Sequence, residues 1–263
     1  YKQLESKKVL IATGAHPSGR KLAHALGHLI VDPVPSLFSL QLDKFSLNVC
    51  TGLALNDVKM SLTVGGKSFQ EVGRILITHS GLSGPAVLRL SAFAARELSK
   101  ARYKARLSIT WIDSNVESVR IYLQKFRYIK SRKKLVNSSP FSKFPKRFWL
   151  IILRQAKIDP FVRWAEFSSK DEQRLIKILL SSVYNVSGKG PFGEEFVTAG
   201  GINLDEINMS TMESRLLSGL YFAGELIDVD GITGGFNFQH CWSSGWLAGN
   251  SIAKSLNSLG ANR

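Results

Sequence analysis

The residues best suited to chemistry lie near the end of the chain, where a strand pattern gives way to a glycine-rich loop. The apolar run 219–223 ends in Gly224-Glu225, and three glycines punctuate the loop 231–235. A carboxylate at the carboxyl end of a buried strand lies where doubly wound folds bind ligands, and it can accept hydrogen bonds from a ribityl chain or a sugar. Glycines also let the backbone approach a flat ligand closely.

The loop leads into a helix that the pattern predicts from Asn237 to about Leu256. The first N–H groups of a helix lack intrahelical partners and form the positive end of its dipole. They suit the negative charge that a flavin gains on its pyrimidine ring when it is reduced. The alternative interpretation of this stretch is a tight structural turn followed by a core helix.

These residues need a sheet to position them, and the start of the chain supplies another part of it. Residues 9–12 are a short apolar run, typical of a strand buried on both faces. Thr13-Gly14 ends this run, and apolar residues then recur at helical spacing from Leu22 to Leu29. We therefore predict an α/β fold in which residues 1–31 and 196–263 form a partial Rossmann-like domain in two discontinuous pieces.

The middle of the chain predicts two inserted subdomains. The sequence pattern of residues 32–112 indicates short strands, with a hairpin turn at Gly65-Gly66. Pro85 is well placed at the first position of a helix within this range. Residues 113–195 have mainly helical periodicity. We expect the first range to be a β-rich subdomain and the second to be a basic helical subdomain.

The helical range carries much of the net charge of +15. Between Glu117 and Asp159 there are twelve Lys and Arg residues and no acidic residue. Concentrated positive charge attracts polyanions, and interleaved aromatic side chains can stack on unpaired bases. The alternative is a solvated helix surface with the aromatics in the core, which we expect for Phe126 and Phe148. The residues predicted to contact RNA are Arg127, Lys130, Lys133, Lys134, Lys146 and Arg147.

Few other residues have a pattern that indicates chemistry. His79 precedes a glycine-rich helix start, where it could donate a proton during reduction of a double bond, although a hydrogen-bonded loop residue is the alternative. The remaining histidines show no metal-ligand spacing, so we predict no metal. Cys50 and Cys241 do not make a disulfide framework, which favours a reducing compartment. Gly188-x-Gly190-x-x-Gly193 does not open the helix that a dinucleotide fingerprint requires.

Several segments together resemble the BaiN/RdsA-like FAD-dependent oxidoreductases, and the similarity extends over nearly the whole chain. They occur in the order of that family and are IATG (11–14), THSGLSGPA (78–86), TAGG (198–201), MES (212–214) and GLYFAGELIDVDGITGGFNFQ (219–239). The resemblance implies bound FAD, with NADH or NADPH as the reductant. It also implies cofactor contacts from Ala12, Thr13, Gly14, Gly224, Glu225, Asp230, Gly231, Thr233, Gly234, Gly235, Phe236 and Asn237.

The same resemblance implies hydride transfer from reduced flavin to an activated carbon–carbon double bond. One branch of the family reduces small molecules, and another makes dihydrouridine in ribosomal RNA. Because of the basic range, a uridine in structured RNA is the preferred substrate. The alternatives are a small unsaturated metabolite, or a non-catalytic RNA-binding protein that retains a degenerate flavin fold.

The family opens with a strand and Gly-x-Gly-x-x-Gly for the FAD pyrophosphate, whereas this chain opens at Tyr1 with neither. We therefore expect the chain to be N-terminally incomplete and to hold FAD weakly by itself. The loop 15–20 is also shorter than the usual glycine- and serine-rich loop of the family. No apolar run approaches the roughly 18 residues of a membrane span. We expect an intracellular protein, in the cytoplasm or in an organelle such as the chloroplast.

Overall fold

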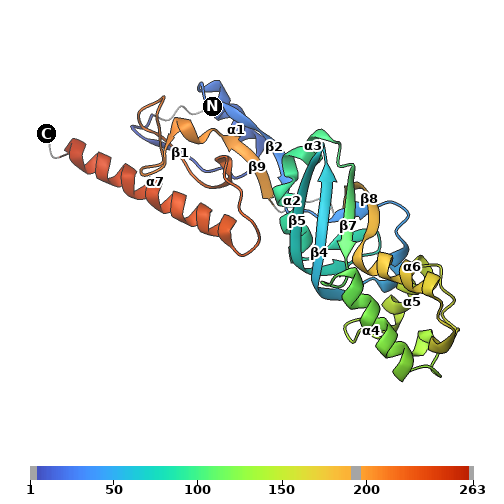
Figure 1. Ribbon diagram of the computed structural model, residues 1–263. Coiled ribbons are helices and arrows are strands. Elements are labelled where there is room, and N and C mark those ends of the chain that lie inside the picture. Colours follow the sequence, from blue (N-terminus) through green and yellow to red (C-terminus); the bar gives the residue numbers. More distant parts are fainter. Residues whose placement is uncertain (1–4, 191–196, 261–263) are drawn as a thin grey trace. The chain divides into compact units, whose positions relative to one another are not determined.

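The computed structural model describes residues 5–190 and 197–260 (Figure 1). The chain divides into two compact units, of which the first is Tyr1–Leu37 together with Glu195–Arg263 and the second is Phe38–Glu194. Both units combine helices and strands, so the fold is mixed α/β. In the described part of the chain, no helix has the length and apolar character needed to cross a membrane.

Within residues 5–37 and 197–260, the first unit contains a four-stranded sheet, an antiparallel strand pair and two helices. The sheet has the order β1-β12-β11-β10, with β1 parallel to β12. The elements of the first unit are β1 (Val9–Ile11), α1 (Pro17–Ala25), β2 (Ile30–Ser36), β9 (Val197–Ile202), β10 (Ile207–Asn208), β11 (Glu213–Ser214), β12 (Leu220–Phe222), the 3₁₀ turns Leu204–Glu206 and Gly224–Leu226, and α7 (Phe236–Gly260). Its core gathers Ile11, Phe222 and Leu226 from segments far apart in the sequence.

The second unit is built on a closed barrel with the strand order β3-β6-β5-β4-β7-β8. The barrel strands and the helices beside them are β3 (Leu40–Leu42), the 3₁₀ turn Ser46–Cys50, β4 (Ala54–Val64), β5 (Lys67–Ile77), β6 (Gly81–Ser83), α2 (Pro85–Phe93), α3 (Ala95–Lys100), β7 (Ala105–Thr110) and β8 (Ser182–Lys189). The hairpin at Gly65-Gly66 is confirmed between β4 and β5. Both glycines have positive φ, 56° and 78°, as a two-residue hairpin turn favours. The helix start at Pro85 is also confirmed.

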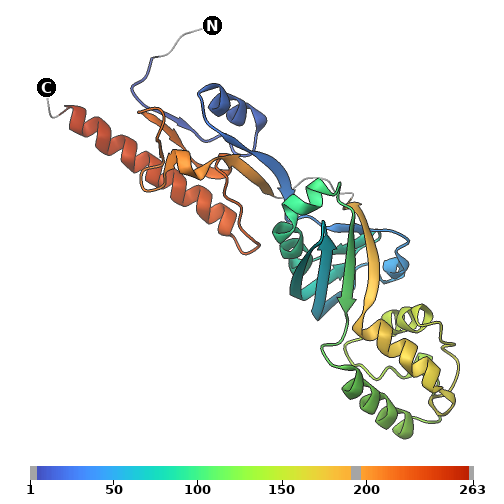
Figure 2. The same cartoon turned by 45° about the horizontal axis from the view of Figure 1, so that its top comes forward.

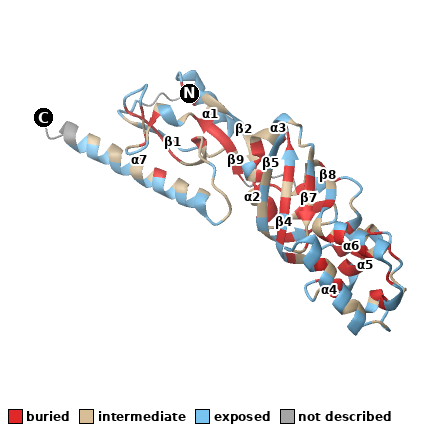
Figure 3. Cartoon of the chain, viewed as in Figure 1, coloured by how far each residue is buried: buried red, intermediate tan, exposed pale blue. Residues whose placement is uncertain are grey.

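A helical segment is inserted between β7 and β8 and lies at one end of the barrel (Figure 2). It consists of α4 (Val116–Ile129), α5 (Lys146–Gln155), α6 (Ser169–Leu180) and the 3₁₀ turns Leu135–Asn137 and Trp164–Glu166. Trp111, Phe148, Trp149 and Trp164 are fully buried, and they belong to the same core cluster as the barrel interior. Buried stretches of ribbon occur both in the barrel strands and in the inserted helices (Figure 3). The inserted segment therefore shares one hydrophobic core with the barrel.

Three expected boundaries differ from the structure. Most of the strand β2 falls in the range predicted for the β-rich subdomain, but the strand pairs with β9 in the first unit. The strand β8 falls in the range predicted to be helical, but it pairs with β7 and β3 and closes the barrel. The helix α1 ends at Ala25, so the apolar spacing that continues to Leu29 is not helical to its end. Gly188 lies within β8, whereas Gly193 lies outside the described residues.

Candidate cofactor site and basic surface

The parallel pairing of β1 and β12 brings two predicted cofactor segments to one edge of the sheet. Ile11 pairs with Phe222, and the N–H of Ala223 donates to the carbonyl of Ile11 at 3.2 Å. Because parallel strands end at the same edge, residues 12–14 and 223–225 leave the sheet side by side. This is the carboxyl edge, where open α/β sheets bind their ligands.

The turn after β1 is shaped by a close contact with α1. Gly14 adopts a left-handed conformation with φ of 62°, and nothing lies within 4 Å of the position that a Cβ would occupy there. At Gly19, by contrast, a Cβ would lie 1.8 Å from Oγ1 of Thr13. The helix therefore approaches the turn at a glycine and fixes Thr13, while Gly14 faces open space.

The two predicted acidic ligands are both held by the first unit itself. Oε1 of Glu225 accepts a hydrogen bond of 2.9 Å from the backbone N–H of Thr198, in β9. Oδ2 of Asp230 accepts one of 3.1 Å from the hydroxyl of Ser36, in β2. Glu225 is half-buried and Asp230 is exposed, and each of these hydrogen bonds fixes the direction of its carboxylate.

The glycine-rich loop is closed by the side chain of Asn237. Its Oδ1 accepts from the N–H of Gly231 at 2.7 Å, and its Nδ2 donates to the carbonyl of Gly231 at 2.9 Å. This pair of hydrogen bonds spans the six residues from the start of the loop to the first turn of α7. Asn237 is one of the residues predicted to border the cofactor, and in the structure its amide fixes the shape of the loop.

The loop turns into α7 through two glycines with positive φ. Gly234 has φ of 124° and Gly235 has φ of 85°, a region that L side chains rarely adopt. The carbonyl of Gly235 accepts the first helical hydrogen bond, from Gln239 at 2.9 Å. The predicted helix is confirmed, with its start at Phe236. Nothing lies within 4 Å of a Cβ built on Gly235, whereas the ring of Phe236 lies against Gly234, with its Cε2 atom 3.2 Å from the position of a Cβ there, and Phe236 is 57% exposed.

Two residues of α7 that the sequence did not single out for the site fix Gly224. Ser244 accepts a hydrogen bond of 2.9 Å from the N–H of Gly224, and Nε2 of His240 lies 3.3 Å from its carbonyl oxygen. Both residues lie on the helix face toward the sheet. Their spacing of four residues is the only signal in the sequence that could have indicated this shared role.

Three large aromatic side chains of α7 are exposed. Phe238, Trp242 and Trp246 are 69%, 68% and 68% exposed, and the first two rings stack at a centroid distance of 6.2 Å. Thr233 is half-buried in the loop that precedes the helix. His79, the predicted proton donor, belongs to the second unit, where it is exposed on the turn between β5 and β6.

The predicted RNA contacts gather on the inserted helical segment. Lys130, Lys133, Lys134, Lys146 and Arg147 are all exposed, and within the described ranges none of them forms an ion pair. The Nζ of Lys146 donates to Asn137 at 3.0 Å. Arg127 is different, because it is half-buried and its Nη2 donates to the carbonyl of Ala165 at 2.9 Å. Arg127 therefore has a structural role that the sequence did not reveal.

The aromatic residues of this segment divide into core and surface. Phe148 is fully buried and Phe126 packs edge-on against Trp164 at 5.1 Å, so the core assignment of both is confirmed. Tyr128 is 87% exposed and Phe161 is 63% exposed. The Nζ of Lys134 lies 5.9 Å from the ring centroid of Phe161. A cation and an aromatic face are thus adjacent on the surface, and Phe161 was missed because it lies outside the basic run.

The family model described as HI0933-like protein Rossmann domain matches residues 2–251. The chain is 29% identical over 250 residues to the 3-dehydro-bile acid delta(4,6)-reductase of Clostridium scindens, which covers 92% of this chain and 59% of that protein. It is 32% identical over 258 residues to the ribosomal RNA dihydrouridine synthase of Escherichia coli, with coverages of 94% and 60%. The Haemophilus influenzae protein of the same name is 29% identical over 272 residues, with coverages of 96% and 62%. The chain therefore spans about 60% of the length of these relatives.

Proposed function

The chain belongs to the HI0933-like family, and from that membership we propose that it acts in an FAD-dependent oxidoreductase that reduces an activated carbon–carbon double bond. In this reaction a hydride adds to one carbon, a proton adds to its neighbour, and NADH or NADPH supplies the reducing equivalents. The substrate that we propose is a uridine of ribosomal RNA.

The first unit supports a flavin site at the carboxyl edge of β1 and β12. Open space beside Gly14 and Gly235 leaves the backbone accessible at both turns. Residues 12–14 and Glu225 would hold the non-aromatic part of the cofactor, and the first turn of α7 would border its ring. Bound FAD supplies the hydride-transfer chemistry. The chain itself fixes the loop through Asn237 and orients Glu225 through the N–H of Thr198.

One observation favours RNA over a small substrate, namely that Lys130, Lys133, Lys134, Lys146 and Arg147 are exposed and form no ion pair with any residue that the structure describes. A small neutral metabolite does not need such a surface, whereas a polyphosphate backbone binds to it by releasing counterions. Two of the relatives are named as ribosomal RNA dihydrouridine synthases, which supports the same substrate class. The third is named as a bile acid reductase, which favours a small unsaturated metabolite as the second candidate.

The test uses the natural full-length protein and a variant with the charges reversed at Lys133→Glu and Lys134→Glu. The matched control is Lys100→Glu with Lys104→Glu, two exposed lysines outside the helical segment. We expect the purified protein to show a flavin absorbance spectrum. We also expect ribosomal RNA to gain two hydrogens at a uridine, measured by mass spectrometry after incubation with NADH or NADPH.

Charge reversal at positions 133 and 134 should weaken RNA binding and reduce the slope of log affinity against log salt by about 2, because about one phosphate contact is lost per lysine. The control should keep the wild-type slope. A protein that binds no flavin would refute the oxidoreductase. A yellow protein that reduces small unsaturated compounds but leaves RNA unchanged would favour the second candidate, and RNA binding without flavin would favour a non-catalytic RNA-binding protein.

A further inference from the structure

Two short stretches of the inserted helical segment pair antiparallel and hold two cations side by side. Lys134 lies opposite Arg163 in a β-bridge. On one side of the bridge the N–H of Leu135 donates to a carbonyl of the other stretch at 3.0 Å, and on the other side the N–H of Trp164 does the same. Hydrogen bonds that flank a pair in this way leave it non-hydrogen-bonded, which is the arrangement that brings opposite side chains closest. Lys134 and Arg163 therefore extend from the same face of the two stretches.

The other face of these two stretches is anchored in the core. Leu135 and Trp164 are fully buried, whereas Lys134 and Arg163 are exposed, as the alternation of side chains along a strand requires. The carbonyl of Leu135 accepts a hydrogen bond of 2.8 Å from Nε1 of Trp149, in α5. The position of the cations is therefore tied to that helix.

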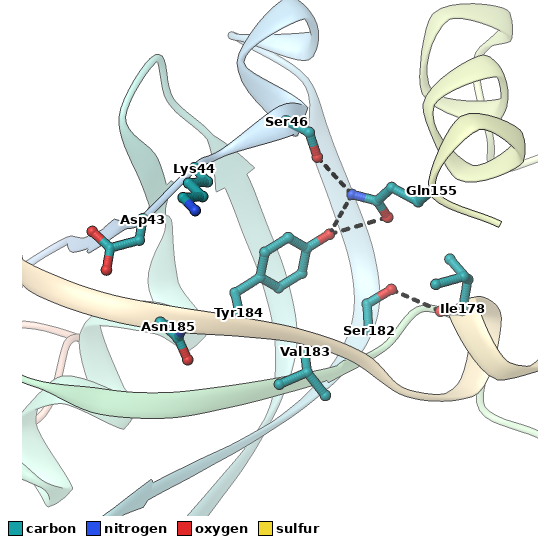
Figure 4. A pocket seen from close by; sticks show the side chains of 9 residues that line it. All are labelled: Asp43, Lys44, Ser46, Gln155, Ile178, Ser182, Val183, Tyr184 and Asn185. Atoms are coloured by element: carbon teal, nitrogen blue, oxygen red, sulfur yellow. Dashed lines mark hydrogen bonds between the residues drawn. The ribbon is translucent and has the colours of Figure 1, made fainter. Parts of the chain in front are cut away.

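The helix α5 is in turn fixed to the barrel by its last residue, Gln155, which lines a cavity there. Nε2 of Gln155 donates to Oγ of Ser46 at 2.8 Å and to the hydroxyl of Tyr184 at 3.0 Å (Figure 4). The two exposed cations thus lie on a support that is hydrogen-bonded through α5 to the barrel. Because this support is folded without a ligand, binding there does not have to order it.

The charges of this pair are not neutralised by the chain. Neither Lys134 nor Arg163 forms an ion pair with any residue in the described ranges. The two acidic residues nearest to Arg163 in the sequence each accept from a backbone N–H, Asp159 from that of Phe161 at 2.9 Å and Glu166 from that of Arg163 at 3.4 Å. Like charges directly opposite each other on paired strands are destabilising. An anion bound between the two cations would relieve this repulsion.

An exposed aromatic ring lies beside the same cations. Phe161 is 63% exposed, and Nζ of Lys134 lies 5.9 Å from the centroid of its ring. The hydrogen bond from its N–H to Asp159 is a local turn contact that fixes the backbone from which the ring extends. A ring that faces water beside cations has the parts of a site for an unpaired nucleotide, in which a base stacks on the ring and a cation holds the phosphate.

We propose that Phe161, Lys134 and Arg163 bind one unpaired nucleotide of an RNA, with the base stacked on the ring of Phe161 and the adjoining phosphate between the two cations. The proposal rests on the RNA partner proposed above, and it adds a preference for unpaired over paired RNA. In a duplex the bases stack on one another, so a side chain has no access to their faces. Stacking on an aromatic ring accepts every base, so this site selects single-stranded structure and not sequence.

The experiment measures the binding of fluorescein-labelled RNAs by the full-length protein through fluorescence anisotropy. One RNA is a hairpin with a loop of uridines, another is the same hairpin with abasic loop residues, and the last is a fully paired duplex of equal length. The variants are Phe161→Ala, Phe161→Tyr and Arg163→Gln. The matched control is Phe93→Ala, an exposed phenylalanine of α2 outside the inserted helical segment. Thermal unfolding of each variant checks that it folds.

We expect Phe161→Ala to weaken binding of the uridine hairpin by about 5-fold to 150-fold, the effect of losing one base–aromatic stack. This variant should leave binding of the abasic hairpin and of the duplex unchanged, and it should keep the wild-type slope of log affinity against log salt, because no phosphate contact is lost. Phe161→Tyr retains the ring and should bind as the wild type does, and so should Phe93→Ala. Arg163→Gln should reduce the slope for the uridine hairpin by about 1.

Wild-type affinity of Phe161→Ala for the uridine hairpin, while charge reversal at Lys133 and Lys134 still lowers it, would overturn this inference and leave the proposed RNA substrate intact. An equal loss of affinity for the abasic hairpin or the duplex would also overturn it, because the ring would then support the surface and not a base. If the wild-type protein binds none of these RNAs, the proposed RNA substrate fails together with this site.

Discussion

Asn237→Ala tests whether one amide side chain shapes the glycine-rich loop. The substitution removes two hydrogen bonds to Gly231, of 2.7 and 2.9 Å. A typical intramolecular hydrogen bond contributes about 0.5 to 1.5 kcal/mol, so the closed loop should lose about 1 to 3 kcal/mol relative to open forms. This corresponds to about a 5-fold to 150-fold shift in the loop equilibrium.

Two measurements follow this shift. Hydrogen exchange of the Gly231 amide should accelerate by the same factor, because exchange occurs through local opening. FAD affinity of the full-length protein, measured by calorimetry, should fall to the extent that the closed loop is the binding-competent form. The matched control is Asn250→Ala, which lies on the same helix and whose amide donates to the carbonyl of Trp246 in its own helix.

Unchanged exchange at Gly231 in Asn237→Ala would refute the role assigned to this amide. Faster exchange combined with unchanged FAD affinity would instead show that Asn237 closes the loop but that the loop does not contact the cofactor. The two readouts thus separate the structural argument from the proposed function.

Three further predictions concern stability and reactivity. Gly201→Ala should lower the free energy of unfolding, measured in urea, by more than about 2 kcal/mol, because the new Cβ would lie 2.4 Å from the carbonyl oxygen of Leu226. The control is Gly245→Ala, whose new Cβ would meet open space within α7. This control should be neutral or stabilising by up to about 1 kcal/mol. Similar losses in both variants would contradict the packing described for β9. Burial raises the pKa of Tyr184 from 10.0 to about 12, so the hydroxyl loses its proton at lower pH in the unfolded chain than in the folded one. The free energy of unfolding should therefore decline between pH 10 and about pH 12, and Tyr184→Phe should remove this part of the decline. Burial raises the pKa of the Cys50 thiol, so less of it is present as the reactive thiolate. A disulfide reagent should therefore modify the partly exposed Cys241 quickly and Cys50 only on unfolding. Equal rates of modification at the two thiols would contradict the burial of Cys50.

Local patterns in the sequence were enough to predict the elements whose residues are neighbours along the chain. The turn at Gly65-Gly66 and the helix after Gly235 depend on glycine at positions of positive φ, and both are confirmed. The basic run from Arg120 to Lys157 is likewise visible because it needs only composition, and its cations do lie on the surface apart from structural exceptions such as Arg127.

The same patterns could not predict which distant segments meet. A strand pattern with period 2 identifies the faces of a strand but not its partner, so the sequence placed most of β2 in the range 32–112 and β8 in the range 113–195, although β2 pairs with β9 and β8 closes the barrel. The partner of a strand is set by backbone hydrogen bonds and by a shared core, which here joins segments more than a hundred residues apart.

For the candidate cofactor site, the identity of the residues could be predicted from the sequence, but the contacts that hold them could not. The sequence by itself determined which residues carry its chemistry, because Gly224-Glu225 and the glycine-rich loop follow an apolar run in one short stretch. Only the tertiary structure decided how these residues are held, since Thr198, Ser36 and Ser244 come from other elements. The physical reason is that a side chain's hydrogen-bond partner is chosen by distance in the folded chain, and that distance depends on strand pairing and packing rather than on spacing along the sequence.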